Sequence, residues 1–345
     1  MRWRRAQRWR RGLLAVLVTA AVVVPLSAAA RPEIPAPAPV VLAPVTAATL
    51  DEAYAANRAN AEEASRMADA HGDRARAATD RAMAAPSRHF LIFDGRGSGR
   101  TAEVLGDLAH ADRVAVLVPG SDTSLDTYDR FRATATHLWT ELNRRGGKIT
   151  ATGAGTGGAG AGASVDTHSD PNLRTAVVAW LGYETPATIS ATVATSGRAE
   201  QAAPPLREFI RQLRGIVGEK ARLSLLCHSY GSVVCGRAAA GLDVDDIALV
   251  GSPGTGADTA TALHTRARVW AARGSDDWVG EVPHVKADLF GTTVGFGTDP
   301  ISPTFGARVF AAGDGGHSDY FAPGSVSLTN LARIVLGETS EVTRA

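Results

Sequence analysis

Three residue types that could act together lie far apart in this chain of 345 residues. Ser229 stands in the stretch LLCHSYGS, between an apolar segment that ends at Cys227 and a segment of helical spacing that begins at Tyr230. A serine hydroxyl is a weak nucleophile at neutral pH, so it needs a base to take its proton and an acid to orient that base. Residues that could supply both follow Ser229 in the chain.

The candidate base is His317, which follows two glycines in the loop sequence GGHSDY. A histidine in such a loop can be brought over a serine without strain in the backbone. His264 and His284 compete for the role, but their segments are less constrained. His228 adjoins Ser229, and we expect its side chain to point away from the serine.

The candidate acid lies just after the apolar run ARVWAA, in the sequence RGSDDWV. Asp277 is the preferred residue there, and Asp276 is the alternative. The resulting chain order is serine, acid, histidine, which is the order found in α/β-hydrolases with a nucleophile on a sharp strand-to-helix turn.

Backbone N–H groups could stabilise an oxyanion that forms on a substrate carbonyl. We expect one from Tyr230, the residue after the nucleophile, and a second from Ser121, in the loop after the apolar run RVAVLV. The neighbouring Gly120 and Asp122 are candidates for the pocket wall. Two aromatic residues after another apolar run, Trp180 and Tyr183, could line the same pocket or pack in the core.

The elements that must position these residues alternate between short apolar strands and helices. We expect strands at 89–93, 113–118, 175–181, 221–227, 246–251 and 267–272, and helices at about 124–144, 199–218, 230–241 and 325–337. Strands that are apolar along their whole length are typical of a mostly parallel sheet covered by helices on both faces. The fold class is therefore α/β, and together with the order of the catalytic residues it predicts an α/β-hydrolase fold.

The N-terminal part has a different composition. Residues 1–30 combine six arginines with an uncharged run from Leu13 to Ala30, which predicts a secretory signal peptide or, alternatively, a signal anchor in the membrane. Residues 31–45 are a Pro/Ala-rich linker. Residues 46–86 are rich in alanine and predict one helix, or two helices broken near Gly72, that we expect to pack on the main domain at 87–345. A flexible glycine-rich insertion is predicted at 146–168.

Charge and composition narrow the partners. After cleavage at residue 30 the chain would hold 30 basic and 35 acidic residues, so nothing in its charge favours nucleic acid. The expected location is outside the cytoplasmic membrane, secreted or in the cell envelope. The spacing of His and Cys shows no metal-ligand pattern, and we expect no metal or cofactor. Cys227 and Cys235 are predicted to be free, buried thiols, because a strand and its covering helix lie about 10 Å apart.

Seven blocks resemble an actinobacterial α/β-hydrolase family that is usually catalogued as a domain of unknown function. They are FLIFD, DRVAVLVPG, AVVAWLGYETP, CHSYGSVVCG, LVGSPGTG, DPISPTFGARVF and GHSDY, in order within residues 88–337. The elbow of that family normally reads GHSYGS, so this sequence departs from it at Cys227 and in the glycine-rich insertion. The resemblance implies Ser229 as nucleophile, His317 as base and the Asp276/Asp277 site as acid.

Three functions follow as expectations. The first is an exported serine hydrolase that cleaves a carboxylic ester or thioester of a small-molecule or lipid-like acyl substrate. The second is an acyltransferase that uses the same triad. The third, from another class, is a non-catalytic envelope protein that binds ligands on a hydrolase fold.

Overall fold

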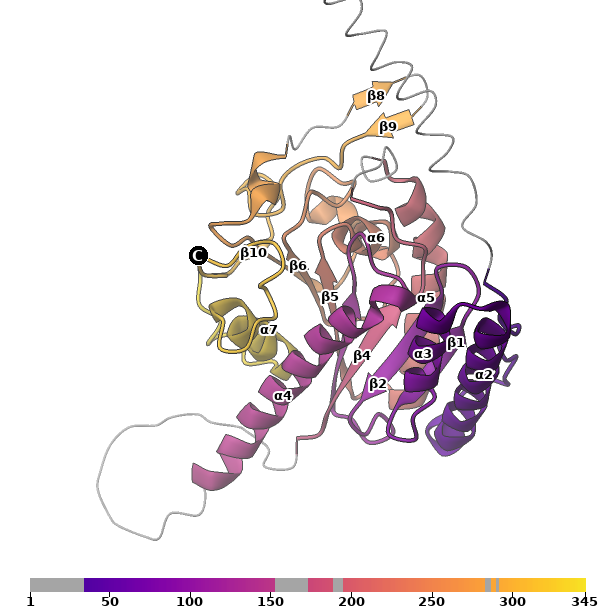
Figure 1. Ribbon diagram of the computed structural model, residues 1–345. Coiled ribbons are helices and arrows are strands. Elements are labelled where there is room, and N and C mark those ends of the chain that lie inside the picture. Colours follow the sequence, from indigo (N-terminus) through magenta and orange to yellow (C-terminus); the bar gives the residue numbers. More distant parts are fainter. Residues whose placement is uncertain (1–33, 153–172, 189–194, 283–286, 290–291) are drawn as a thin grey trace, which may run out of the picture.

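The computed structural model describes residues 34–152, 173–188, 195–282, 287–289 and 292–345, and a β-sheet lies at its centre (Figure 1). This sheet has eight strands. The strand order is β1-β2-β4-β3-β5-β6-β7-β10. The six strands from β4 to β10 run parallel, and β2 is antiparallel to both of its neighbours, β1 and β4. The bounds are β1 His89–Asp94, β2 Arg100–Leu105, β3 Arg113–Val118, β4 Thr175–Leu181, β5 Arg222–His228, β6 Asp246–Val250, β7 Arg268–Ala272 and β10 Arg308–Val309.

Helices cover both faces of the sheet, which confirms the predicted α/β-hydrolase fold class. On one face, α5 (Gly197–Val217) and α6 (Gly231–Ala238) bury their apolar side chains against the central strands. On the other face lie α4 (Tyr128–Thr152) and α7 (Val326–Leu336). The strands between them are almost wholly buried, as their uniform apolar sequence predicts. A small separate hairpin joins β8 (Ala287–Leu289) to β9 (Thr292–Val294).

The alanine-rich N-terminal segment forms two helices, the second of the two alternatives that its sequence left open. α2 (Leu50–His71) ends at Gly72, whose left-handed conformation closes the helix, and α3 (Arg74–Met83) begins after the side chain of Asp73 caps it. The pair packs at the β1 edge of the sheet, where the Asn57 amide donates to the carbonyl of Leu91 (3.2 Å). This segment is thus held on the main domain.

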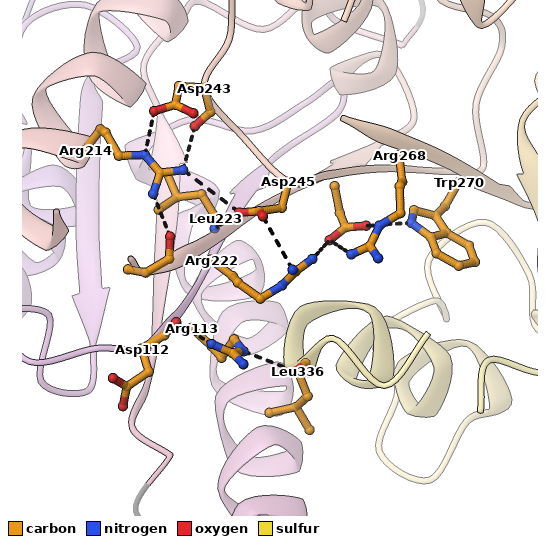
Figure 2. Close-up of polar contacts among 12 residues, drawn as sticks. Asp112, Arg113, Arg214, Arg222, Leu223, Asp243, Asp245, Arg268, Trp270 and Leu336 are labelled. Atoms are coloured by element: carbon orange, nitrogen blue, oxygen red, sulfur yellow. Dashed lines mark hydrogen bonds and ion pairs between the residues drawn. The ribbon is translucent and has the colours of Figure 1, made fainter. Parts of the chain in front are cut away.

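The edge of the sheet at the amino ends of the strands is tied together by ion pairs (Figure 2). Asp246, at the start of β6, is fully buried and accepts hydrogen bonds from Arg268 (2.8 Å from both Nε and Nη2) and from Arg222 (3.0 Å). The indole of Trp270 donates to the same carboxylate at 2.8 Å. This end of the sheet is closed by structural contacts, and the other end carries the candidate site.

Two predicted segments fall partly or wholly outside the description. α4 continues through Thr152, so the first residues of the predicted insertion at 146–168 are helical and the rest lie outside the described residues. The predicted signal sequence at residues 1–30, including the possible anchor at 13–30, also lies outside them. Within the described ranges, none of the helices combines the length and the apolar character that crossing a bilayer requires.

Candidate active site

Ser229 sits at the tip of a sharp turn between β5 and α6. Its φ angle is 53°, a left-handed conformation that is uncommon for a residue with a side chain. Strand and helix pass very close to the neighbouring β3 here, because a Cβ atom at Gly231 would lie 2.5 Å from the carbonyl oxygen of Val118. Only glycine fits at position 231, and this geometry has the form of the sharp strand-to-helix turn that the sequence predicts.

The structure brings the three predicted residues into one hydrogen-bonded row. His317 Nε2 lies 2.9 Å from Ser229 Oγ, and His317 Nδ1 lies 2.9 Å from Asp277 Oδ1. The alternative acid Asp276 is exposed and contacts the hydroxyl of Ser275 instead. Of the competing histidines, His264 does not line the site pocket and His284 lies outside the described residues.

Asp277 is held as a carboxylate. Its side chain is buried, and burial alone would raise its pKa. Hydrogen bonds from His317, from the hydroxyl of Tyr320 and from the backbone N–H of Val279 outweigh this effect and lower the pKa of Asp277 to about 2. The acid next to the histidine is therefore ionised at every pH at which the protein is expected to work.

The prediction for His228 was wrong. Its side chain does not point away from the serine but lines the same pocket, with its ring centroid 4.8 Å from that of His317. His228 Nε2 lies 2.7 Å from the carbonyl oxygen of His317, so it donates a hydrogen bond to the loop that carries the candidate base. Burial, followed by the nearby charge of His317, lowers the pKa of His228 to about 4, and this ring is neutral at neutral pH.

The two predicted oxyanion donors lie next to Ser229. The loop after β3 is so close that a Cβ atom at Gly120 would fall 2.6 Å from the Cβ of Ser229. Ser121 and Tyr230 both line the pocket, and within the described residues the N–H of neither one donates to a protein acceptor. The phenol hydroxyl of Tyr230 donates to the carbonyl of Thr195 (2.7 Å) and so already has a protein acceptor.

The row opens into a pocket of about 710 Å³. Its walls are mostly apolar: Phe131 comes from α4, Phe296 from the segment after β9, Phe321 from the loop after His317, and Trp278 from the turn after Asp277. Polar groups line it near the serine, in the loop of Gly120, Ser121 and Asp122, and along the start of α4, where Arg130 and Thr134 contribute. An apolar chamber with a few convergent polar groups is the usual form of a site for a small molecule.

Trp180 and Tyr183 do not line this pocket, so the prediction that counted them as pocket candidates was wrong. Both are buried in the core on the face covered by α5, where Trp180 stacks on Tyr183 and packs against Phe209. The hydroxyl of Tyr183 donates to the carbonyl of Pro119 at 2.6 Å. Tyr183 therefore supports the loop of Gly120 from behind.

Cys227 and Cys235 form a disulfide, which corrects the prediction of two free thiols. Their Cα atoms are 6.4 Å apart. The spacing of about 10 Å between packed layers applies to strands and helices that lie side by side. At the elbow, however, β5 turns directly into α6, and Cys235 lies only one turn into that helix. The hydroxyl of Ser232 donates to the carbonyl of Cys227 (3.2 Å) and shows how closely the two elements meet.

Two residues of the site were not identified from sequence alone. Tyr320 lies in the quoted GGHSDY loop, but its hydroxyl contacts Asp277, which no local pattern indicates. Trp278 is adjacent to Asp277 in the chain and half exposed, with its ring centroid 4.8 Å from that of His317. The position of Trp278 directly after the candidate acid is the sequence signal that could have identified it.

Comparison with known sequences assigns the class. A family model described as "Alpha/beta hydrolase" matches residues 94–287, which is more than half of the chain. The chain therefore belongs to this alpha/beta hydrolase family.

More particular similarities are distant. The chain is 29% identical over 267 residues to two proteins described as uncharacterized, from the strains CDC 1551 / Oshkosh and ATCC 25618 / H37Rv of Mycobacterium tuberculosis. The match covers 70% of this chain but only 37% of those relatives. Among solved structures, a serine hydrolase without lid from Xanthomonas campestris is 13% identical with a TM-score of 0.41, and covers 74% of this chain and 95% of its own. The esterase LipW from Mycobacterium marinum is 13% identical with a TM-score of 0.41, and the coverage is 78% and 87%.

Proposed function

We propose that this protein is an exported serine hydrolase that cleaves carboxylic esters or thioesters through an acyl-enzyme on Ser229. The observation that carries the proposal is the continuous row from Ser229 Oγ through the imidazole of His317 to the carboxylate of Asp277, with 2.9 Å at each step. Each member has the chemistry and the contact that its role requires.

The proposed reaction starts with attack of Ser229 Oγ on the substrate carbonyl carbon while His317 Nε2 takes the hydroxyl proton. Asp277 fixes the imidazole with Nδ1 protonated and stabilises the cation that forms. The same proton then passes to the leaving alcohol or thiol, and the acyl group remains on the serine. Water, activated by His317, releases the acid and restores the hydroxyl.

The negative charge on the carbonyl oxygen would be met by the N–H groups of Ser121 and Tyr230. Their position beside Ser229 and their lack of a protein acceptor within the described chain support this role. Donors that are fixed before reaction contribute about 10²–10³ in rate each in serine hydrolases. A glycine at 120 lets the backbone approach closely enough for this purpose.

The pocket supports an apolar acyl group as the substrate portion. Its volume of about 710 Å³ falls in the upper range of small-molecule sites, and most of its lining is apolar or aromatic, with Arg130 and Asp122 as charged exceptions. Phe131, Phe296 and Phe321 line the pocket, and the ring of Phe296 lies edge-on to that of Tyr230. We infer that medium-sized or bulky apolar acyl groups fit better than acetyl.

Export is supported by two independent features. The first is the arginine-rich start of the chain followed by an uncharged apolar run. The second is the disulfide between Cys227 and Cys235, since such bonds persist mainly in oxidising compartments outside the cytoplasm. We propose that the folded domain works in the cell envelope or the medium.

The experiment that tests the proposal is labelling with a fluorophosphonate, which reacts with activated serines. The wild type should be labelled, and mass spectrometry should place the adduct on Ser229. Ser229→Ala should not be labelled, whereas Ser87→Ala, at an exposed turn before β1, should be labelled like the wild type. An unlabelled wild type, or equal labelling of Ser229→Ala, would support a non-catalytic binding protein instead.

Product analysis then separates hydrolysis from transfer. With p-nitrophenyl esters of increasing chain length, hydrolysis predicts release of free acid and a preference for acyl groups longer than acetyl. If an added alcohol or sugar accepts most of the acyl group in competition with water, the protein is an acyltransferase. Both outcomes use the same acyl-enzyme, so the labelling result does not depend on this distinction.

A further inference from the structure

The hydroxyl of Tyr320 makes two hydrogen bonds inside the site. It donates to Asp277 Oδ2 at 2.5 Å and accepts from the backbone N–H of Gly274 at 3.0 Å. The side chain is 3% exposed, and its ring lies 5.8 Å from that of His228. The proposed mechanism does not use this residue, yet it contacts the acid directly.

We propose that Tyr320 is a positioning residue, which holds the Asp277 carboxylate in the one orientation that supports His317. The proposal rests on the proposed function and adds a fourth member to its row. Asp277 Oδ1 accepts from His317 Nδ1 and from the N–H of Val279, both at 2.9 Å, and Tyr320 occupies the opposite oxygen. With both oxygens engaged, rotation of the carboxylate would break at least one contact to a fixed donor.

One loop supplies both the candidate base, His317, and the positioning residue, Tyr320. His317 and Tyr320 are three residues apart, and both side chains reach Asp277. The loop also packs tightly against the turn that carries the acid, because a Cβ atom at Gly274 would lie 2.0 Å from the carbonyl oxygen of Gly315. If this loop were displaced, Asp277 would lose its contacts with both His317 and Tyr320.

Gly251, just after β6, packs directly against the side chains of Asp277, Tyr320 and His317. A Cβ atom there would lie 2.9 Å from Asp277 Oδ2, 2.9 Å from the ring of Tyr320 and 3.1 Å from His317 Nδ1. A side chain larger than that of glycine therefore cannot fit at position 251 without displacing one of these three groups. The contacts of Tyr320 are therefore built into the packing of the site.

The direction of the hydrogen bond is fixed by protonation. Burial raises the pKa of Tyr320, and the adjacent carboxylate raises it further, so the phenol stays protonated at working pH. Asp277, an ionised carboxylate, can only accept. The tyrosine is thus a constant donor to the acid, and it competes with the imidazole N–H for the negative charge of the carboxylate.

The test is Tyr320→Phe, compared with Tyr54→Phe, which removes the hydroxyl of another buried tyrosine on α2. Tyr320→Phe should lower kcat by about tenfold or more with KM little changed, since a lost charge-assisted hydrogen bond is typically of that size. The acid limb of kcat/KM should move to higher pH, because a carboxylate with one donor fewer holds the imidazole proton more strongly. Tyr54→Phe should change neither quantity.

A readout that needs no substrate separates this proposal from the proposed function. Proton NMR of the wild type should show a downfield signal from the Nδ1–H of His317 that is absent in His317→Gln. That signal should shift or vanish in Tyr320→Phe and persist in Tyr54→Phe. If the wild type fails to label with fluorophosphonate but shows this pattern, the hydrolase function fails and the positioning role stands.

An unchanged NMR signal and an unchanged pH profile in folded Tyr320→Phe would overturn the proposal. If Tyr320→Phe does not fold, site-specific Tyr320→3-fluorotyrosine keeps the hydroxyl and makes it a stronger donor. The acid limb should then move to lower pH, opposite to the effect of removal. No movement in that variant would also overturn the positioning role.

Discussion

The disulfide between Cys227 and Cys235 gives a stability effect that can be worked out in advance. The two residues are eight positions apart, and the bond closes a short loop that contains the turn at Ser229. Loop-closure entropy for about eight residues corresponds to about 2.5 kcal/mol at 25 °C. We expect Cys227→Ala/Cys235→Ala to lower the free energy of unfolding by about that amount, and the melting temperature by roughly 4 °C in a protein of this size.

The single variants make the prediction sharper. Either one breaks the bond, so Cys227→Ala and Cys235→Ala should each cost about as much as the double variant. Two independent thiols in the core would instead give costs that add in the double variant. Urea denaturation of the three variants and the wild type, without reductant, measures these free energies.

A separate chemical measurement could refute the reasoning. The wild type, unfolded without reductant, should show no free thiol by titration and two after reduction. Two thiols before reduction, or additive costs of the single variants, would mean that the disulfide is absent. The support that this bond gives to export would then be lost as well.

Three further predictions concern other positions. Gly120→Ala should lower ester hydrolysis and fluorophosphonate labelling by about 100-fold or more, with an unchanged circular dichroism spectrum, because the new Cβ would lie 2.6 Å from the Cβ of Ser229. The wild type should lose stability as the pH falls from about 6.5 toward 4, since unfolding frees His228, whose pKa is lowered to about 4, to take up a proton. In His228→Gln the loss between pH 7 and 4.5 should be smaller by about 2.5 kcal/mol, measured by urea denaturation; an equal loss would contradict it. Asp246→Asn should cost about 2–3 kcal/mol by the same assay, because Arg268 and Arg222 lose their buried partner, while the exposed Asp112→Asn should cost under about 1 kcal/mol.

The sequence was sufficient for the central strands and for the order of the candidate residues. Continuous apolar runs predicted six strands, and each lies within a residue or two of its predicted bounds. β2 was missed because it is not an apolar run: it contains Glu103, which is buried only because Arg88 and Arg132 neutralise it. A buried charge whose partners are distant in sequence leaves no local periodicity to detect.

The side-chain positions at the site depended on a different kind of information. The row of candidate groups follows from chain order and turn geometry, which are local properties. Trp180 was misplaced because residues at the end of a strand alternate between the two faces, and no local pattern tells which face α5 will cover. The disulfide was missed because an average layer spacing was applied at the one place where strand and helix are joined.

The difference between local patterns and contacts of distant segments also explains why the hydrogen bond from Tyr320 to Asp277 was not predicted. Three glycine-containing turns carry the candidate residues Ser229, Asp277 and His317, and their glycines and order in the chain can be recognised in the sequence. The contact of Tyr320 with Asp277 arises only when two such turns dock on each other, with Gly274 against Gly315. Under the proposed function, His317 and Tyr320 both contact Asp277 from one loop, so activity depends on the correct docking of that loop. A substitution that disturbs this docking, such as Gly274→Ala, should therefore lower the rate of ester hydrolysis strongly while the protein stays folded by circular dichroism.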